Sequence, residues 1–200
     1  MCHPRRHNRG MTNALPPDAV PARPAGPEAP FRVLMVCMGN ICRSPTAEGV
    51  LRHQIVQAGL DGFVEVDSAG THAYHLGCAP DARSQRHAHA RGYDLAPLRA
   101  RQVCAADYAH FDLLLAMDWD NLALLEDGCP PDPVLRRKLR RLTDFIPAGS
   151  PLAGSQVVPD PYYGGADGFD HVLDLVEAAC EGLVTHLRQV VASVGTNPSH

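Results

Sequence analysis

The chain has 200 residues, a hydrophobic share of 45% and a formal net charge of −4. That length suits one ordinary domain plus a tail, with enough apolar residues for a real core, while the negative charge argues against a nucleic-acid or anionic-membrane partner. No apolar run approaches the ~18 residues of a membrane span, and the seven scattered cysteines, an odd number without a CxxC pair, favour free thiols in a reducing cytoplasm.

Residues 1–30 are rich in Pro, Arg, His and Ala and show no periodicity, a composition that cannot bury a core. We therefore predict a disordered N-terminal tail over 1–30, a domain over 31–194 and a disordered C-terminus over 195–200. The arginines near the N-terminus lack the apolar region of a signal peptide.

The stretch from Phe31 to Glu48, FRVLMVCMGNICRSPTAE, predicts a strand, a loop and a helix. Its short apolar run, Val33 to Val36, is bounded by turn-forming residues and suits a buried strand of a parallel sheet. Ser44 is a favourable N-cap, Pro45 fits the first helical position, and Glu48 in the first turn suits the helix dipole.

The loop from Cys37 to Ser44 has the features of an oxyanion site. Gly39 and Asn40 tolerate φ > 0, so consecutive backbone N–H groups can point into one concavity beside the positive end of the helix. The same donors would stabilise the thiolate of Cys37, and the planar fork of Arg43 can hold two phosphate oxygens at once. The predicted chemistry is attack of a thiolate on phosphorus. Because these groups supply the charge stabilisation that a metal would give, we expect neither metal nor cofactor.

The nine residues from Cys37 to Pro45, CMGNICRSP, resemble the signature of the low-molecular-weight protein tyrosine phosphatases, and the resemblance extends over roughly 31–187. It implies an α/β fold of three layers with a central four-stranded parallel sheet, in which the phosphate loop joins the first strand to the first helix. It also implies hydrolysis of phosphotyrosine through a cysteinyl phosphate. We expect Ser44 to hydrogen-bond the Cys37 sulfur and Asn40 to hold the loop conformation. The loop residues expected to bind the substrate are Met38, Gly39, Asn40, Ile41, Cys42 and Ser44.

A second strand is predicted over 63–67, and a crossover of this length makes it parallel to the first. Its end, the predicted turn Ser68-Ala69-Gly70-Thr71, then lies at the same sheet edge as the loop. In the resembled family a matching turn sits beside the phosphate loop, so Ser68 is expected to brace Asn40. Tyr74 occupies the place of an aromatic residue that lines the pocket. Leu98 stands where many relatives have a histidine, so this bracing should be weaker or arranged differently.

The rest of the chain completes an α/β pattern. Residues 111–117, FDLLLAM, predict a buried strand, and Asp118 is a suitable cap for the helix that follows. Residues 134–141, VLRRKLRR, predict a basic helix that either guides acidic or phosphorylated substrates or is simply solvated. The other expected elements are helices over 45–58, 80–91 and 168–194, with stops at Gly59 and Gly92, and a strand over 142–146.

The segment from Val157 to Gly165, VVPDPYYGG, resembles the general-acid loop of the same family. Displacement of an aryl oxide by a thiolate needs a proton donor on the far side of the phosphorus, and Asp160, flanked by prolines and aromatic residues, could keep its proton in mildly acidic solution. Asp160 is then expected to activate the hydrolytic water. Tyr162 and Tyr163 would form the other wall of the pocket, and in relatives the equivalent tyrosines can be phosphorylated.

Cys42 is a candidate redox residue next to Arg43. A five-residue arc around a phosphate brings its ends together, so the sulfurs of Cys37 and Cys42 are expected within disulfide reach. Peroxide would convert the Cys37 thiolate to a sulfenic acid, which Cys42 would capture as a disulfide. The alternative is that Cys42 only packs the loop.

Two other functions remain open on the sequence alone. Thiol-based arsenate reductases share this fold and a similar loop, but they need resolving cysteines, and Cys78 and Cys104 are not closely paired. A module that binds phosphotyrosine without turnover is the non-enzymatic alternative. The resemblance favours the phosphatase, acting as a monomer or weak dimer on a tyrosine-phosphorylated protein. In bacterial relatives that protein is often a tyrosine kinase of surface-polysaccharide export.

Overall fold

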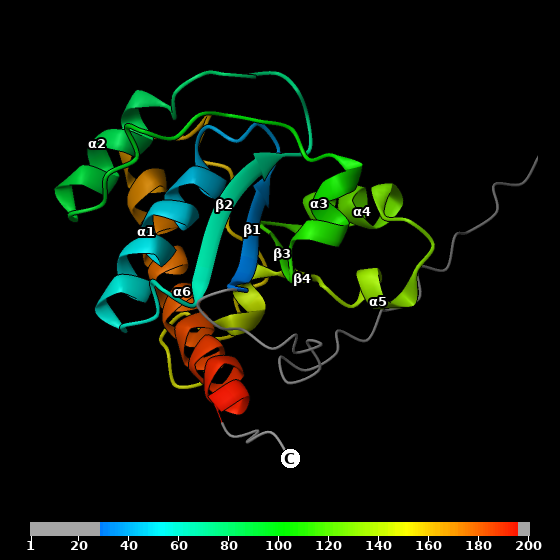
Figure 1. The fold of residues 1–200 in the computed structure, drawn as a ribbon. Coiled ribbons are helices and arrows are strands. Elements are labelled where there is room, and N and C mark those ends of the chain that lie inside the picture. Colours follow the sequence, from blue (N-terminus) through cyan, green and yellow to red (C-terminus); the bar gives the residue numbers. More distant parts are fainter. Residues whose placement is uncertain (1–28, 196–200) are drawn as a thin grey trace, which may run out of the picture.

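A computed structural model describes residues 29–195, and its centre is a sheet of four strands in the order β2-β1-β3-β4 (Figure 1). All three neighbouring pairs run parallel. The strands are β1 (Phe31–Cys37), β2 (Val64–Gly70), β3 (Leu113–Ala116) and β4 (Leu139–Arg141). The prediction of a central four-stranded parallel sheet is confirmed. Most of the two predicted tails, residues 1–28 and 196–200, lies outside the described part of the chain.

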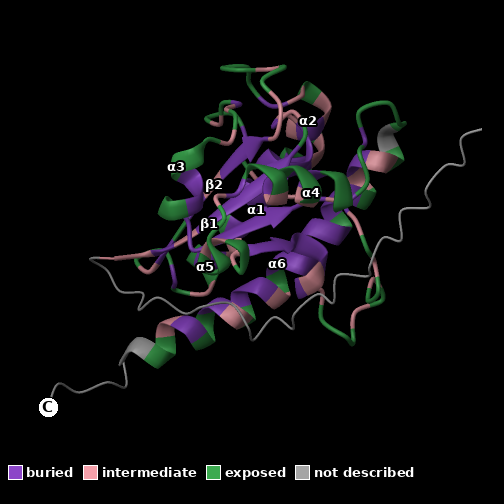
Figure 2. Cartoon of the chain, turned by 90° about the vertical axis from the view of Figure 1, so that its right-hand side faces the viewer, coloured by how far each residue is buried: buried purple, intermediate pink, exposed green. Residues whose placement is uncertain are grey.

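Helices cover both faces of this sheet and give three layers, as Figures 1 and 2 show. The helices are α1 (Arg43–Gln57), α2 (Ala82–Ala90), α3 (Ala105–His110), α4 (Trp119–Gly128), α5 (Pro133–Arg136) and α6 (Ala166–Gly195), with the short 3-10 helix η2 (Leu142–Phe145). α1 and α6 pack together on one face, whereas α3 and α4 lie on the other. Within residues 29–195, no helix has both the length and the apolar character needed to cross a membrane.

The strand β1 connects the two halves of the core. Side chains alternate across a strand, so Val33 and Met35 pack toward α1 and α6 while Leu34 and Val36 pack toward α3 and α4. All four are fully buried. Burial on both faces explains why this stretch is continuously apolar, and it places the end of β1, where Cys37 lies, at the centre of the sheet edge.

The fourth strand lies earlier in the chain than predicted. The prediction of a strand over 142–146 is wrong, since those residues begin with η2, and the actual strand β4 falls inside the predicted basic helix over 134–141. The contacts of Arg141 explain how a charged residue can belong to this strand. Its nearly buried guanidinium pairs with Asp144 at 2.6 Å and donates to the carbonyl of Gln156 at 3.0 Å. The pairing of β4 with β3 therefore overrides the helical pattern of the sequence.

The strand β2 extends beyond the predicted range of 63–67. Ser68, Ala69 and Gly70, which were expected to form a turn, instead pair with the last three residues of β1. The strand β3 is conversely shorter than the predicted 111–117. The longer β2 carries Ser68 directly to the side of the loop that follows β1.

The start of α1 differs from the prediction, although its end does not. Cys42 is the N-cap residue without a side-chain cap, so Ser44 is the second residue of the helix rather than its cap, and Pro45 is the third. Glu48 is buried and does not complement the helix dipole in the first turn. At the other end, Gly59 follows the C-cap with φ of 70°, the left-handed conformation expected of a helix stop.

Candidate active site

A cavity of about 350 Å³ opens at the carboxyl end of β1, where an α/β sheet of this kind usually binds its ligand. Three segments far apart in the sequence line it. The lining residues are Cys37, Met38, Gly39, Ile41, Cys42, Arg43, Tyr74, His75, Asp160, Tyr162 and Tyr163. Apart from His75, all were candidates from the sequence. Asn40 and Ser44 are buried behind the loop rather than on the cavity wall.

The sulfur of Cys37 is held by two polar contacts. The backbone N–H of Asn40 donates to it at 3.3 Å, and the hydroxyl of Ser44 lies 3.1 Å away. The predicted contact between Ser44 and the sulfur is therefore present, and it explains why this hydroxyl does not cap the helix. The two contacts fix the position of the sulfur at the start of the loop.

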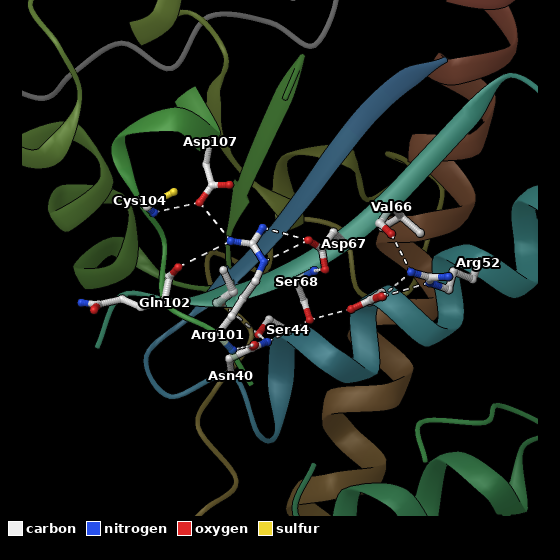
Figure 3. Close-up of polar contacts among 12 residues, drawn as sticks. Asn40, Ser44, Arg52, Val66, Asp67, Ser68, Arg101, Gln102, Cys104 and Asp107 are labelled. Carbon is white, nitrogen blue, oxygen red and sulfur yellow. Dashed lines mark hydrogen bonds and ion pairs between the residues drawn. The ribbon is translucent and has the colours of Figure 1, made fainter. Parts of the chain in front are cut away.

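Asn40 holds the loop in its bent conformation. Its φ of 55° lies in the left-handed region, which asparagine tolerates better than most residues. The side-chain amide donates to Ser44 Oγ at 2.9 Å and to Ser68 Oγ at 2.8 Å, and its oxygen accepts from the Arg101 backbone N–H at 2.9 Å (Figure 3). The predicted contact between Ser68 and Asn40 is present. These three bonds fix the amide orientation, and with it the loop.

A buried carboxylate stands behind this network. Ser68 donates to Glu48 at 2.6 Å, and Glu48 accepts from Arg52 Nε at 2.9 Å. Burial raises the pKa of Glu48 above its ordinary value of 4.5, and the Ser68 hydrogen bond and the charge of Arg52 offset this only in part. The sequence predicted a weaker or differently arranged bracing, because Leu98 stands where many relatives have a histidine. In this chain the Ser68 hydroxyl donates its hydrogen bond to Glu48.

Arg101 anchors the network to the sheet and to α3, as Figure 3 shows. Its guanidinium pairs with Asp67 of β2 at 2.8 Å and with Asp107 of α3 at 3.0 Å. Its backbone N–H is the donor to Asn40. Sequence reasoning missed this role, because nothing in the order of residues shows that the main chain at Arg101 meets the loop.

The end of β2 packs against the loop backbone without room for a side chain. Thr71 N–H donates to the Cys37 carbonyl at 2.8 Å, and His72 N–H donates to the Met38 carbonyl at 3.0 Å. A Cβ atom at Gly70 would lie 2.7 Å from the Met38 carbonyl oxygen. Only glycine fits at this position, so the contact fixes the distance between β2 and the loop.

Arg43 lies under the cavity with its guanidinium almost fully buried and bound to acceptors. It pairs with Asp118 at 2.5 Å and with Asp160 at 3.0 Å, and it donates to the Val158 carbonyl at 3.3 Å. Burial alone would lower the pKa of Arg43, but the negative charges of Cys37, Asp160 and Asp118 outweigh it and raise that pKa. The sequence identified Asp118 only as a helix cap, which it also is. Its position directly after a buried parallel strand was the available signal.

Asp160 reaches the cavity from the loop before α6. One carboxylate oxygen bonds to Arg43, and the other accepts from the Tyr162 backbone N–H at 3.1 Å. The side chain is 42% exposed. Asp160 was expected in apolar surroundings that favour its proton, whereas here it forms an ion pair. A phosphate that takes Arg43 Nη2 would therefore compete with this carboxylate.

Aromatic side chains form the rim of the cavity. Tyr74 stacks on His72 with ring centroids 4.9 Å apart, and Tyr162 meets Tyr163 edge to face at 4.9 Å. Tyr163 is almost fully exposed. This arrangement leaves a polar floor for an anion and an aromatic mouth for a flat ring.

Cysteine, arginine and aspartate around a loop of this shape are the groups that phosphoryl transfer through sulfur requires. The sequence profile for low molecular weight phosphotyrosine protein phosphatases matches residues 32–193. A low molecular weight protein-tyrosine-phosphatase of Streptomyces coelicolor is 43% identical over 162 residues, covering 80% of this chain and 96% of that protein. The chain therefore belongs to the low molecular weight phosphotyrosine protein phosphatase family.

Solved structures agree with this assignment. A protein tyrosine phosphatase from Entamoeba histolytica, with Hepes in its active site, superposes with a TM-score of 0.74 at 40% identity, over 80% of this chain and 97% of that one. A drosophila arginine phosphatase superposes with a TM-score of 0.70 at 33% identity, over 79% and 98%.

Proposed function

We propose that the protein hydrolyses phosphotyrosine in proteins through a cysteinyl-phosphate intermediate. The observation that carries this proposal is that Cys37, Arg43 and Asp160 line one cavity. Asp160 is far from the other two residues in the sequence. Cys37 attacks phosphorus, while the loop N–H groups and Arg43 bind the phosphate oxygens. The reaction needs no metal, because the loop N–H groups and Arg43 stabilise the negative charge on the phosphate oxygens.

In the first step a sulfur–phosphorus bond forms, the bond from phosphorus to the phenolic oxygen breaks, and Asp160 gives its proton to that oxygen. In the second step water attacks phosphorus and passes a proton to Asp160, while the sulfur leaves as a thiolate. The Ser44 hydroxyl, 3.1 Å from the sulfur, stabilises that thiolate. Once the incoming phosphate has displaced it from Arg43, the Asp160 carboxylate takes up a proton from solvent and is then the proton donor.

The aromatic rim supports an aryl phosphate as the substrate. Tyr74, Tyr162 and Tyr163 can stack on a phenyl ring whose phosphate reaches the loop. Because one structural relative is an arginine phosphatase by name, phosphoarginine peptides belong in the substrate panel. We expect phosphotyrosine peptides to give the larger kcat/KM, and faster turnover of phosphoarginine would contradict the proposed substrate class.

The experiment that tests the mechanism is Asp160→Ala with two leaving groups. The general acid matters most for a basic leaving group, so we expect kcat on a phosphotyrosine peptide to fall about 100-fold, with a much smaller loss on para-nitrophenyl phosphate. Equal losses on both substrates would contradict the role of Asp160. Thiol-dependent arsenate reduction, assayed in parallel, should stay at background, and a rate above phosphatase turnover would favour the reductase.

We further propose a cytoplasmic location and a tyrosine-phosphorylated protein as partner, such as a bacterial tyrosine kinase, with the enzyme a monomer or weak dimer. The free thiols at Cys37, Cys42, Cys78, Cys104, Cys129 and Cys180 support a reducing compartment. Dephosphorylation of a purified tyrosine kinase, compared between the wild type and Cys37→Ser, tests the choice of partner.

A further inference from the structure

The loop that carries Asp160 is attached to the rest of the molecule at the carboxylate and again two residues further on. Asp160 itself is bound to Arg43 on the cavity floor at 3.0 Å. Two residues further on, the carbonyl of Tyr162 accepts a hydrogen bond from Arg83 Nη1 at 3.0 Å. Arg83 belongs to α2, and neither the sequence reasoning nor the mechanism above gives it a role.

The guanidinium of Arg83 is held in a fixed orientation. Its Nε and Nη2 donate to the two carboxylate oxygens of Asp81 at 3.0 and 2.8 Å, a bidentate pair that uses the planar fork of arginine. The same group lies 4.8 Å from the ring centre of Phe169 and 5.4 Å from that of Tyr162. Its third donor is thereby aimed at the Tyr162 carbonyl before any substrate arrives.

Tyr162 links this contact to the carboxylate. Its backbone N–H donates to Asp160 at 3.1 Å, and its carbonyl is the group that accepts from Arg83. When a phosphate takes Nη2 of Arg43, Asp160 loses its ion pair on the cavity floor. The hydrogen bond from Arg83 does not involve the phosphate-binding groups, so it can persist.

We propose that Arg83 is a positioning residue for the general acid: it holds the Asp160–Tyr162 turn in place after substrate has displaced Asp160 from Arg43. Arg83 touches no reacting atom, and its effect passes through the Tyr162 peptide to the Asp160 carboxyl. This inference rests on the proposed function, because it needs Asp160 to be the proton donor.

The variant Arg83→Ala separates this role from stability of α2. Asp81 is the N-cap of α2, and it accepts from the backbone N–H of residue 83 at 2.8 Å, a bond that alanine keeps. We expect the variant to fold. Arg86 is an exposed arginine on the same helix, and Arg86→Ala is therefore the matched control.

The test compares kcat/KM for a phosphotyrosine peptide and for para-nitrophenyl phosphate. A misplaced general acid affects the basic leaving group selectively, so Arg83→Ala should lose about tenfold on the peptide and less than about twofold on the nitrophenyl ester. Arg83→Lys keeps the charge but not the fork, and its loss should be intermediate. Arg86→Ala should match the wild type on both substrates.

The same comparison in an Asp160→Ala background decides between the two proposals. With the acid absent, adding Arg83→Ala should change neither rate by more than about twofold. A tenfold loss that persists in that background, or equal losses on both substrates in the single variant, would overturn the role of Arg83. If Asp160→Ala itself shows no dependence on the leaving group, the proposed function fails instead. If circular dichroism shows that Arg83→Ala is unfolded, Arg83→Lys is used instead. The deciding quantity is then the ratio of its kcat/KM on the peptide to that on the nitrophenyl ester, and a ratio equal to that of the wild type overturns the inference.

Discussion

Cys42 is the predicted redox partner of Cys37, but its thiol resists ionisation. It lines the cavity beside Cys37, but burial raises its pKa to about 12, and the negative charges of Asp81 and Cys37 add to this effect. Oxidation of Cys37 to a sulfenic acid removes one of those charges, whereas burial, the larger cause, remains. We therefore expect capture of the sulfenic acid by Cys42 to be slow at neutral pH and faster in alkaline solution.

The predicted product is a disulfide between Cys37 and Cys42, formed with release of water. In alkaline solution, activity lost to peroxide should return with dithiothreitol in the wild type, whereas in Cys42→Ser the loss should be largely irreversible. Phosphate in the cavity should slow the loss. Mass spectrometry of the oxidised protein identifies the bridge. Equal recovery in Cys42→Ser would show that Cys42 is not the resolving thiol, and a bridge to Cys78 would name the substitute.

Glu48 gives the stability a dependence on pH of definite sign. Because its pKa is raised in the folded protein, the folded state binds this proton more tightly than the unfolded state does. Its favourable contribution is complete below the ordinary pKa and is lost as the pH rises through the raised one. The free energy of unfolding of the wild type, minus that of Glu48→Gln, should therefore fall as the pH rises above 4.5. Urea unfolding of both proteins measures it, and a difference that rises with pH would contradict the assignment.

At the scale of elements, the contact between β2 and the phosphate loop sets the geometry of the site. A methyl group at Gly70 would press on the backbone carbonyl of Met38. A backbone atom cannot turn aside as the end of a flexible side chain can. We expect Gly70→Ala to destabilise the protein by about 1–3 kcal/mol and to weaken phosphate binding. Gly149→Ala is the matched control, since a Cβ there meets nothing within 4 Å. Thermal unfolding and phosphate titration check both effects, and a Gly70→Ala protein with unchanged phosphate affinity would contradict the argument.

The elements also show what the sequence could and could not predict. The loop from Cys37 to Ser44 was predictable because its anion-binding features are contiguous and depend on backbone conformation. The strand β4 was not, because its pairing with β3 and the contact of Arg141 with Gln156 are tertiary effects. The Ser44 cap failed for a related reason: its hydroxyl contacts the Cys37 sulfur instead of a backbone N–H in the first turn of the helix.

At the scale of the whole molecule, the site depends on which segments the fold brings to one edge of the sheet. β1 lies between β2 and β3, so the segments that follow these three parallel strands all meet around Cys37. Asp118, Arg101 and Arg83 each act on a residue far away in the chain. The contacts of Arg101 and Arg83 could not be read from local patterns, whereas the position of Asp118 after a buried strand was a signal. Resemblance to a family identified Asp160 as a candidate, and the fold shows how the loop before α6 places it in the cavity.

The central claim is that Cys37 carries the phosphoryl group during turnover. The most direct measurement uses Asp160→Ala, which should form the intermediate from radiolabelled para-nitrophenyl phosphate but hydrolyse it slowly, since the base for water is missing. After an acid quench and proteolysis, we predict label on the peptide that contains Cys37, and none when Cys37 is also changed to Ser. Label on another residue, or continued turnover by Cys37→Ser, would contradict the mechanism.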